Sequence, residues 1–474
     1  MIGLLVFLLC VLLLVLGYGC YGRLAEKIYG EPNDVVMPCV EKPDGVDFVP
    51  LPTWKIFLIQ LLNIAGLGPV VGAISGCLFG PAALLWIVLG CIFAGAMHDF
   101  LAARMSADAG GANLPEVVGE NLGHWASHVM RTVCVGMLLL VGVVFTLLPA
   151  GMLHGIAPAV SEFNWCAIII SYYFLATILP INVIIGRIYP LFGALFLFMA
   201  VGMAVMLPVS GYEVLPNLDV FTNVHPTGMA IWPALFVTIA CGAISGFHAT
   251  QSPMMVRCLS DARKLRRVFY GAMIVEGLVA LVWATVGLTL RNVAVPDANG
   301  GEMLFCALKP AVAVHAACRL LLGSKLAVLA VLGVVVLAVS SGDTAMRSCR
   351  LMLSDLLRLD QRKIVKRLAL ALPIFAAVII LTNVDFSIVW RYFGWANQGL
   401  SCITLWSIAV CLRRRGRFYW LALLPALFMT TMCAAFLLSA HECAIEMDLC
   451  YASAIGAAFT VILTGGFFAL CRRA

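Results

Sequence analysis

Long apolar runs alternate with short polar segments along almost the whole chain. A helix that crosses the hydrocarbon core of a bilayer needs about 20 mostly apolar residues. At that length the pattern predicts thirteen membrane-spanning helices, at residues 1–20, 56–80, 82–105, 130–153, 165–186, 189–210, 229–250, 267–290, 325–346, 367–382, 387–411, 418–438 and 451–471. Charged residues and a proline interrupt the apolar segment 304–322, where we expect an interfacial helix or a hairpin.

Composition supports this reading. Hydrophobic residues make up 63% of the chain and charged residues 11%, against about 45–50% and about 25% in soluble proteins. The excess apolar surface must face membrane lipid. This excludes three classes of protein: soluble enzymes, disordered chains and nucleic-acid-binding proteins. The run 1–20 lacks the basic segment and cleavage site of a signal peptide, so we predict that it is a first span. Cys443 and Cys450 share one short loop and can form a disulfide if that loop faces an oxidising compartment.

Lysine and arginine concentrate in alternate loops. They crowd the segments 257–267, 347–367 and 413–417 and recur at 472–473, whereas the loops 211–228 and 439–450 contain none. Short loops rich in lysine and arginine stay in the cytoplasm. The sequence therefore predicts an N-terminus outside and a C-terminus in the cytoplasm.

A pentapeptide repeat gives the most information about architecture. The sequence Gly-Ala-Ile-Ser-Gly at 72–76 recurs at 242–246, which is 170 residues and five predicted helices later. Because five is odd, the two copies cross the membrane in opposite directions. Glycine- or proline-interrupted helices in inverted halves indicate the binding site of a secondary transporter. We predict one five-helix repeat at 56–210 and an inverted one at 229–411, with 1–20 an added N-terminal helix and 418–471 two peripheral helices. The alternative is that small-residue pentapeptides merely pack helices tightly.

The two interruptions define the candidate substrate-binding site. A helix broken at mid-membrane exposes N–H donors at a half-helix N-terminus, where they suit a carboxylate. Hydroxyl and amide side chains nearby add donors, although Ser75 and Ser245 have the alternative of bonding back to their own helices. Asn63 either joins this pocket or caps the half-helix. The candidate substrate-binding residues are Gly66, Gly68, Gly72, Ser75, Gly242, Ser245, Gly246, His248, Gln251 and Asn397.

Ionisable residues within predicted spans are candidates for ion coupling. Glu276 is the preferred proton carrier, with a static hydrogen-bonded role as its alternative. Asp99 either works with His98 or pairs with Arg104 at the membrane boundary. Asp343 is either a cation ligand or the partner of Arg347. The candidate coupling residues are Glu276, Asp99, His98, Asp343, Ser340 and Ser341, with H⁺ favoured over Na⁺.

Motifs for soluble-enzyme chemistry are absent from the sequence. It has no Walker loop, no GxSxG and no HExxH, so we expect no catalytic residues, no bound metal, no cofactor and no ATP-driven pumping. Two alternatives to a transporter remain. One is an ion or solute channel. The other is a membrane-embedded metalloenzyme with His98, Asp99, His248 and Glu276 as ligands, although their spacing matches no standard metal signature.

At these same segments the sequence resembles the carbon starvation protein A family. The matching stretches, at 66–72, 85–100, 241–248, 271–276, 342–350 and 397–398, span most of the chain from 58 to 412. The resemblance implies an inner-membrane protein that takes up peptides or pyruvate under carbon starvation. It also implies kinship with the amino acid–polyamine–organocation superfamily, whose LeuT-like core has five plus five helices in inverted repeats. Together these observations predict proton-coupled import of a small carboxylate-bearing nutrient, either a short peptide or a 2-oxo acid such as pyruvate.

Overall fold

The computed structural model describes residues 2–31, 35–181, 185–226, 228–296, 301–440 and 445–472. Regular structure in these residues is helical apart from one antiparallel hairpin, β1 (Ala294–Pro296) and β2 (Glu302–Leu304). The longer helices are α1 (Ile2–Gly19), α2 (Tyr21–Tyr29), α4 (Thr53–Ala65), α6 (Ala82–Gly90), α7 (Ala96–Asp108), α8 (Leu114–Leu122), α9 (His124–Ile156), α10 (Glu162–Ile178), α11 (Ile185–Val209), α12 (Ile231–Thr238), α13 (Gly246–Val256), α14 (Gly271–Leu290), α15 (Pro310–Leu356), α16 (Ile364–Leu381), α17 (Phe386–Arg414), α18 (Trp420–Ser439) and α19 (Leu449–Arg472). The short ones are α3 (Pro38–Glu41), η1 (Gly68–Gly72), α5 (Ala73–Ser75), η2 (Gly76–Phe79), η3 (Cys91–Gly95), η4 (Ala262–Lys264), η5 (Arg266–Tyr270) and η6 (Phe305–Ala307).

The predicted class, an all-α polytopic membrane protein, is confirmed. Within the described residues, ten helices are long and apolar enough to cross a membrane, and a bent pair, Thr53–Ala65 with Gly68–Phe79, makes up to eleven. The two other predicted spans fall on α10, which has 17 residues, and on the interrupted segment α12–α13. The total of thirteen stays a prediction, because these two do not meet the same criterion.

One helix boundary differs clearly from the sequence prediction. Helix α15 continues to Leu356 instead of ending near 346, so Arg347 and Arg350 lie inside a helix and are fully buried. The predicted cytoplasmic loop is wrong for these two residues, because arginines next to an apolar run usually lie in loops and here they continue the helix. The segment 304–322 begins with the last residue of β2 and contains the first turns of α15 before a break at Gly323. Its location at the membrane interface stays a prediction.

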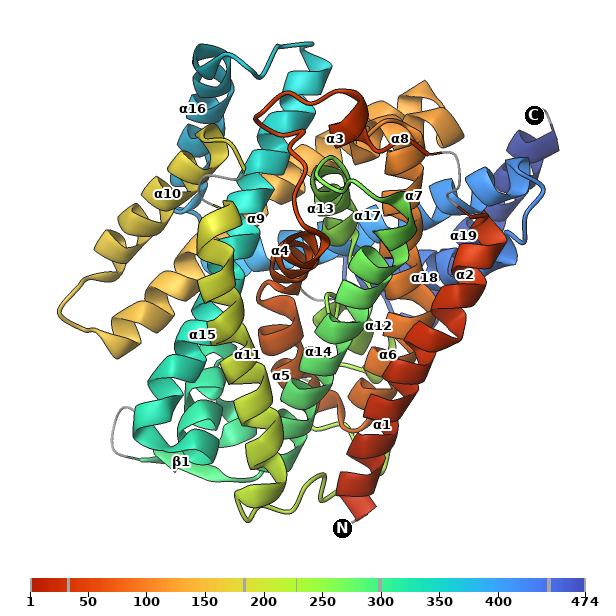
Figure 1. Cartoon of the computed structure of the whole chain (residues 1–474). Helices are drawn as coiled ribbons and strands as arrows, with labels where there is room; N and C mark the ends of the chain where they lie inside the picture. Colours follow the sequence, from red (N-terminus) through yellow and green to blue (C-terminus); the bar gives the residue numbers. More distant parts are fainter. Residues whose placement is uncertain are drawn as a thin grey trace.

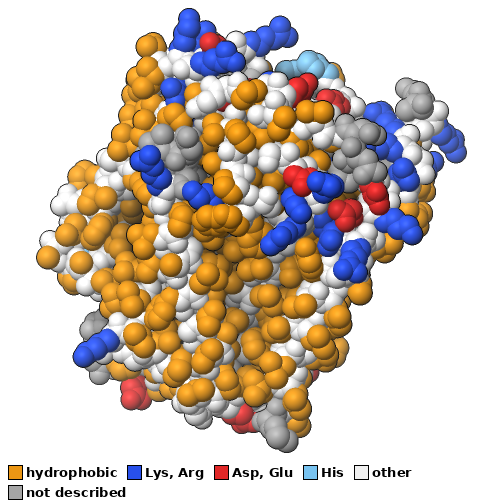
Figure 2. Space-filling model, viewed as in Figure 1, with side chains coloured by type: hydrophobic (Ala, Val, Ile, Leu, Met, Phe, Trp, Pro, Cys, Tyr) orange, Lys and Arg blue, Asp and Glu red, His pale blue; other side chains and the backbone are white. Residues whose placement is uncertain are grey.

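The helices run mostly along one long axis, and the two marked ends of the chain lie toward opposite ends of the molecule (Figure 1). Helix α14 lies near the middle and packs against α1, α4 and α11. Hydrophobic side chains cover the central part of the face in Figure 2, and lysine and arginine gather at the end where α3, α8 and α16 lie. We call this the basic end of the molecule.

Candidate functional site

The first helix break lies between α4 and η1. Gly66 has a φ of 29°, a region that L side chains rarely adopt, and α4 ends just before it. The Gly66 N–H donates to Ser341 Oγ (3.1 Å), and the same hydroxyl donates to the Leu62 carbonyl (3.0 Å). The Ser340 hydroxyl also reaches the Leu62 carbonyl, at 3.1 Å. Both serines of α15 therefore satisfy backbone groups that the break sets free.

The second break separates α12 from α13. Asn397 of α17 caps the N-terminus of α13, since its Oδ1 accepts the Phe247 N–H (2.8 Å) and the Ser245 hydroxyl (2.9 Å). The predicted alternative for Ser245, a bond to its own helix, is therefore wrong. Gly246 lies so close to α17 that a Cβ there would be 2.4 Å from the Asn397 carbonyl oxygen.

The two breaks pack directly against each other. A Cβ on Gly68 would lie 2.3 Å from Cys241 Cβ, and one on Gly72 would lie 2.6 Å from the Thr238 carbonyl oxygen. Gly242 is equally close to α14, where a Cβ would lie 2.4 Å from Ala280 Cβ. The backbone segments of the two breaks thus approach as only glycine permits. The five-plus-five inverted repeat itself stays a prediction.

Four ionisable side chains form a buried row beside the second break. His98 Nδ1 lies 2.8 Å from Asp99 Oδ1, and His248 Nδ1 lies 2.9 Å from Asp99 Oδ2. His248 Nε2 in turn lies 3.5 Å from Glu276 Oε2. All four side chains are fully buried. Helices α7, α13 and α14, which are distant in sequence, contribute to this row, which we call the central relay.

The hydrogen-bond chemistry of the central relay determines where its protons lie. An ionised Asp99 accepts from Nδ1–H of both imidazoles, which leaves each Nε2 without a proton when the ring is neutral. His248 Nε2 and the Glu276 carboxyl then need one proton between them, because two acceptors repel each other. A proton on either member of the His248–Glu276 pair removes that repulsion.

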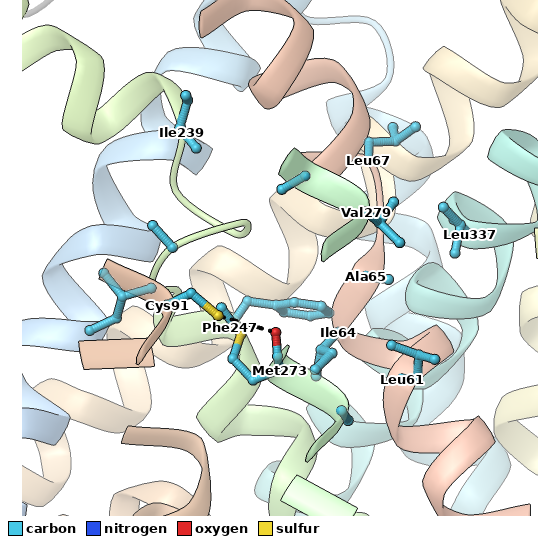
Figure 3. Packing of buried hydrophobic residues seen from close by; sticks show 14 of the residues in the cluster. Leu61, Ile64, Ala65, Leu67, Cys91, Ile239, Phe247, Met273, Val279 and Leu337 are labelled. Atoms are coloured by element: carbon cyan, nitrogen blue, oxygen red, sulfur yellow. Dashed lines mark hydrogen bonds between the residues drawn. The ribbon is translucent and has the colours of Figure 1, made fainter. Parts of the chain in front are cut away.

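Close apolar packing surrounds the relay. The Cys91 thiol of η3 donates to the Met273 carbonyl at 3.4 Å, one turn before Glu276 (Figure 3). The Phe247 ring extends from α13 toward Ile64 of α4, and these two helices pack together (Figure 3). The four relay side chains are shielded from bulk solvent, so electrostatic interactions among them are strong.

Unpaired polar atoms lie on α4 near the same place. The side-chain nitrogen and oxygen of Gln60 and of Asn63 are buried without a hydrogen-bond partner, as are both carboxyl oxygens of Glu276. Gln60 and Asn63 are three residues apart and so share one face of α4. Helix α4 packs against α11, α13, α14 and α15, so this face is enclosed by other helices. An unpaired buried amide costs free energy until a ligand or water pairs with it.

The remaining predicted residues lie apart from the relay. Asp343 accepts hydrogen bonds from Tyr172 (2.6 Å) and Tyr189 (2.8 Å), so its predicted pairing with Arg347 is wrong. Ser75 bonds back to the Val71 carbonyl at 2.7 Å, as its alternative predicted. Gln251 contacts Thr250 and accepts from Ser348 of α15 at 3.2 Å.

Arg104 pairs with Asp108 at 3.1 Å, and Asp99 with the two histidines, so the predicted Asp99–Arg104 pair is also wrong. The four relay side chains lie in a row and do not surround a common point. In the part of the chain that the structure describes, no group of three or more His, Cys, Asp or Glu could hold a metal ion. Cys443, one partner of the predicted disulfide, lies outside the described residues.

Comparison with known proteins identifies the family. The family model "Carbon starvation protein CstA" matches residues 2–163, 154–315 and 300–435. The chain belongs to this family. An uncharacterised membrane protein of Haemophilus influenzae is 43% identical over 333 residues, covering 60% of this chain and 90% of that protein.

Named relatives are more distant. The peptide transporter CstA of Campylobacter jejuni is 26% identical over 339 residues, covering 56% of this chain and 47% of that protein. The pyruvate/proton symporter BtsT of Escherichia coli is 26% identical over 324 residues, covering 55% and 45%. The chain thus matches about half the length of these named relatives. Among solved structures, a manganese transporter of Eremococcus coleocola has a TM-score of 0.50 at 13% identity, covering 91% of this chain and 99% of that one. This likeness shows that the chain shares the fold of that protein.

Sequence reasoning missed three residues that hold candidate site residues in place. Tyr172 and Tyr189 bind Asp343, and Asp47 binds the buried arginines of α15. Tyrosines in apolar helices usually anchor at the membrane interface, so no local signal marked these two. Asp47 lies in a polar loop whose sequence resembles any other turn.

Proposed function

We propose that this protein is a proton-coupled secondary transporter that imports a small carboxylate-bearing nutrient, either a short peptide or a 2-oxo acid such as pyruvate. One observation carries the proposal: two discontinuous helices pack break to break, and a buried relay of titratable groups lies beside them. The names of the relatives, which include peptide transporters and a pyruvate/proton symporter, support the same reading.

Substrate binding belongs at the paired breaks. The proposed residues are Gly66, Gly68, Gly72, Gly242, Ser245, Gly246, His248, Gln251 and Asn397. The Asn397 side chain already accepts one backbone N–H at the N-terminus of α13. A substrate carboxylate bound there therefore competes with Asn397 for that N–H or replaces it. The unpaired amides of Gln60 and Asn63 supply additional donors on the opposite helix. Ser75 is a weaker candidate because its hydroxyl is bonded to its own helix.

Proton coupling belongs at the central relay. Glu276 Oε2 lies 3.5 Å from His248 Nε2 in a fully buried site, and Asp99 and His98 extend the relay toward α7. Sodium is the weaker alternative. Its expected ligands, the hydroxyls of Ser340 and Ser341, already bond to the Leu62 carbonyl, and two tyrosines bind the Asp343 carboxylate.

Alternating access would then move the two proposed repeats, 56–210 and 229–411, against each other, with 1–20 and 418–471 outside this core. We place the protein in the cell inner membrane with its N-terminus outside and its C-terminus in the cytoplasm. The concentration of lysine and arginine at the basic end supports that orientation (Figure 2).

The test is uptake of radiolabelled dipeptide and of radiolabelled pyruvate by proteoliposomes, with an inward proton gradient and with sodium replaced by choline. One proton carried with a zwitterionic dipeptide moves one net charge, worth about 2.3 kcal/mol per 100 mV, whereas one carried with a monocarboxylate moves none. Dependence on membrane potential therefore separates the two substrates.

Glu276→Gln should abolish proton-driven accumulation, while Glu302→Gln on the exposed hairpin makes the same chemical change and should have no effect. Absence of accumulation of either solute in the wild-type protein would refute the substrate class. Sodium-dependent uptake that survives Glu276→Gln would refute proton coupling.

A further inference from the structure

A buried ionic cluster joins a loop near the start of the chain to α15. Asp47 Oδ1 accepts from Arg347 Nη1 at 2.9 Å, and Arg350 Nη2 reaches both Asp47 carboxylate oxygens, at 3.0 and 3.1 Å. Asp47 is 1% exposed and both arginines are fully buried. Asp47 thus makes the kind of charge-assisted, multiply bonded contact with which guanidinium groups recognise carboxylates.

The cluster has more positive than negative charge. A third guanidinium, from Arg367, is also buried and donates to the Ile178 carbonyl at the end of α10. Asp47 is the fully buried carboxylate among these three arginines, while Asp44 of the same loop is half-buried and uses its Oδ1 to accept backbone N–H groups. The Nε atoms of Arg347, Arg350 and Arg367 are buried without a partner. A site with surplus buried donors and surplus positive charge is suited to an anion.

The loop that carries Asp47 connects two sides of the molecule. Toward α13, the Leu51 N–H donates to the Cys258 carbonyl at 3.1 Å, and the Cys258 thiol reaches the Asp47 carbonyl at 3.5 Å. Toward α10, the Ile181 N–H donates to the Val46 carbonyl at 3.1 Å. Any movement of α13 away from α10 and α15 must therefore break contacts of this loop.

The cluster lies in line with the candidate transport site. Ser348, next to Arg347 on α15, donates to Gln251, which lies one turn beyond His248 on α13. Both α4 and α13 lead from the breaks toward the end of the molecule where this loop lies. Gln251 and Ser348 thus connect the second break, through α13 and α15, to Arg347 and Arg350.

We propose that Arg347 and Arg350 form a carboxylate-binding site at the cytoplasmic exit. Asp47 occupies this site while the exit is closed. When the loop moves away, the carboxylate of the departing solute takes its place. The inference rests on the proposed function, because it requires a carboxylate-bearing solute. Exchange of one carboxylate for another keeps both guanidinium groups paired, whereas simple removal of Asp47 leaves buried charges uncompensated.

Hydrogen–deuterium exchange of residues 44–51, measured by mass spectrometry on the full chain in detergent, tests the proposal. Acetate serves as the probe, compared with chloride at equal ionic strength. Acetate should speed exchange of this loop about twofold or more relative to chloride, and Arg350→Gln should remove the difference. Asp47→Asn should speed exchange about tenfold without any added anion. Asp261→Asn, which removes a carboxylate from an exposed pair with Arg263, is the matched control and should change nothing.

Equal exchange in acetate and chloride would overturn the proposal, and this comparison uses the wild-type chain, so it does not depend on whether Asp47→Asn folds. Phosphate as effective as acetate would show a general anion site and would also overturn it. If acetate opens the loop but no carboxylate is taken up by proteoliposomes, the proposed function fails and the site stands. If uptake occurs but acetate has no specific effect, this inference alone fails.

Discussion

Asp99→Asn tests the central relay most sharply. Aspartate and asparagine side chains have the same shape, but asparagine lacks the negative charge and has an NH₂ donor in place of one acceptor oxygen. The Asp99 carboxylate accepts from both His98 and His248. Its negative charge favours a proton on the neighbouring His248–Glu276 pair. The substitution removes this attraction, so proton loading requires a lower pH.

The size of the effect follows from the geometry. The contacts of 2.9 and 3.5 Å on either side of the His248 ring put the Asp99 and Glu276 carboxylate oxygens at most about 9 Å apart. At an effective dielectric constant of about 20, unit charges at that distance interact by about 2 kcal/mol, equivalent to about 1.5 pH units. We therefore expect the pH of half-maximal uptake to fall by about 1.5 units.

The assay is initial uptake by proteoliposomes across a range of external pH, with thermal stability measured on the same preparation. Loss of a charge-assisted hydrogen bond should also cost about 1–3 kcal/mol of folding free energy. Asp343→Asn is the control, because Asp343 is equally buried but bonds to Tyr172 and Tyr189. It should lower stability without moving the pH profile. A folded Asp99→Asn protein with the wild-type profile would refute the relay, and a shift in Asp343→Asn would transfer the coupling role to Asp343.

Three further outcomes are expected. Gly246→Ala should prevent folding, because the new Cβ would lie 2.4–2.5 Å from backbone atoms of α17. The measurement is loss of the monodisperse peak in size-exclusion chromatography. Gly136→Ala is the control and should be tolerated, because the space around Gly136 is open. Asn63→Leu should abolish uptake while leaving the melting temperature unchanged or higher, since it removes buried polar atoms that have no partner. Burial raises the pKa of Asp47, but Arg350 and Arg347 outweigh it and lower the pKa from 3.8 to about 2. The stabilisation from this pair is therefore complete above ~pH 5 and is lost only as the pH falls toward 2, so protection of residues 44–51 from exchange should be constant between about pH 5.5 and 8.

Much of the candidate site could be predicted because its signals are local. Gly66 and the glycines of the two pentapeptides interrupt apolar runs, and Glu276 and Asp99 are carboxylates within such runs. Each feature violates the usual composition of a membrane helix, so each is visible without knowledge of its neighbours. The predicted breaks and the resemblance to the CstA family followed from them.

Partnerships between distant residues could not be predicted. Asp99 has Arg104 within two turns, yet it bonds to His248, which lies 149 residues away. Arg347 was assigned to a loop because a charge next to an apolar run normally marks the membrane surface. The buried Arg347 pairs with Asp47, which lies 300 residues earlier. The sequence of a single helix cannot indicate that a carboxylate from another part of the chain will pair with one of its arginines.

The Asp47 cluster also has a consequence for biogenesis. Ribosomes release the loop around Asp47 long before α15, since 303 residues separate Asp47 from Arg350. Until the two segments meet, we expect the arginines of α15 to stay hydrated at the bilayer surface, because an unpaired arginine is costly at greater depth. The C-terminal part of α15 can then reach its buried position only when Asp47 pairs with its arginines. We therefore expect insertion to be completed when the Asp47 loop joins a segment translated about 300 residues later, and a nascent chain with Asp47 replaced should stall at that step.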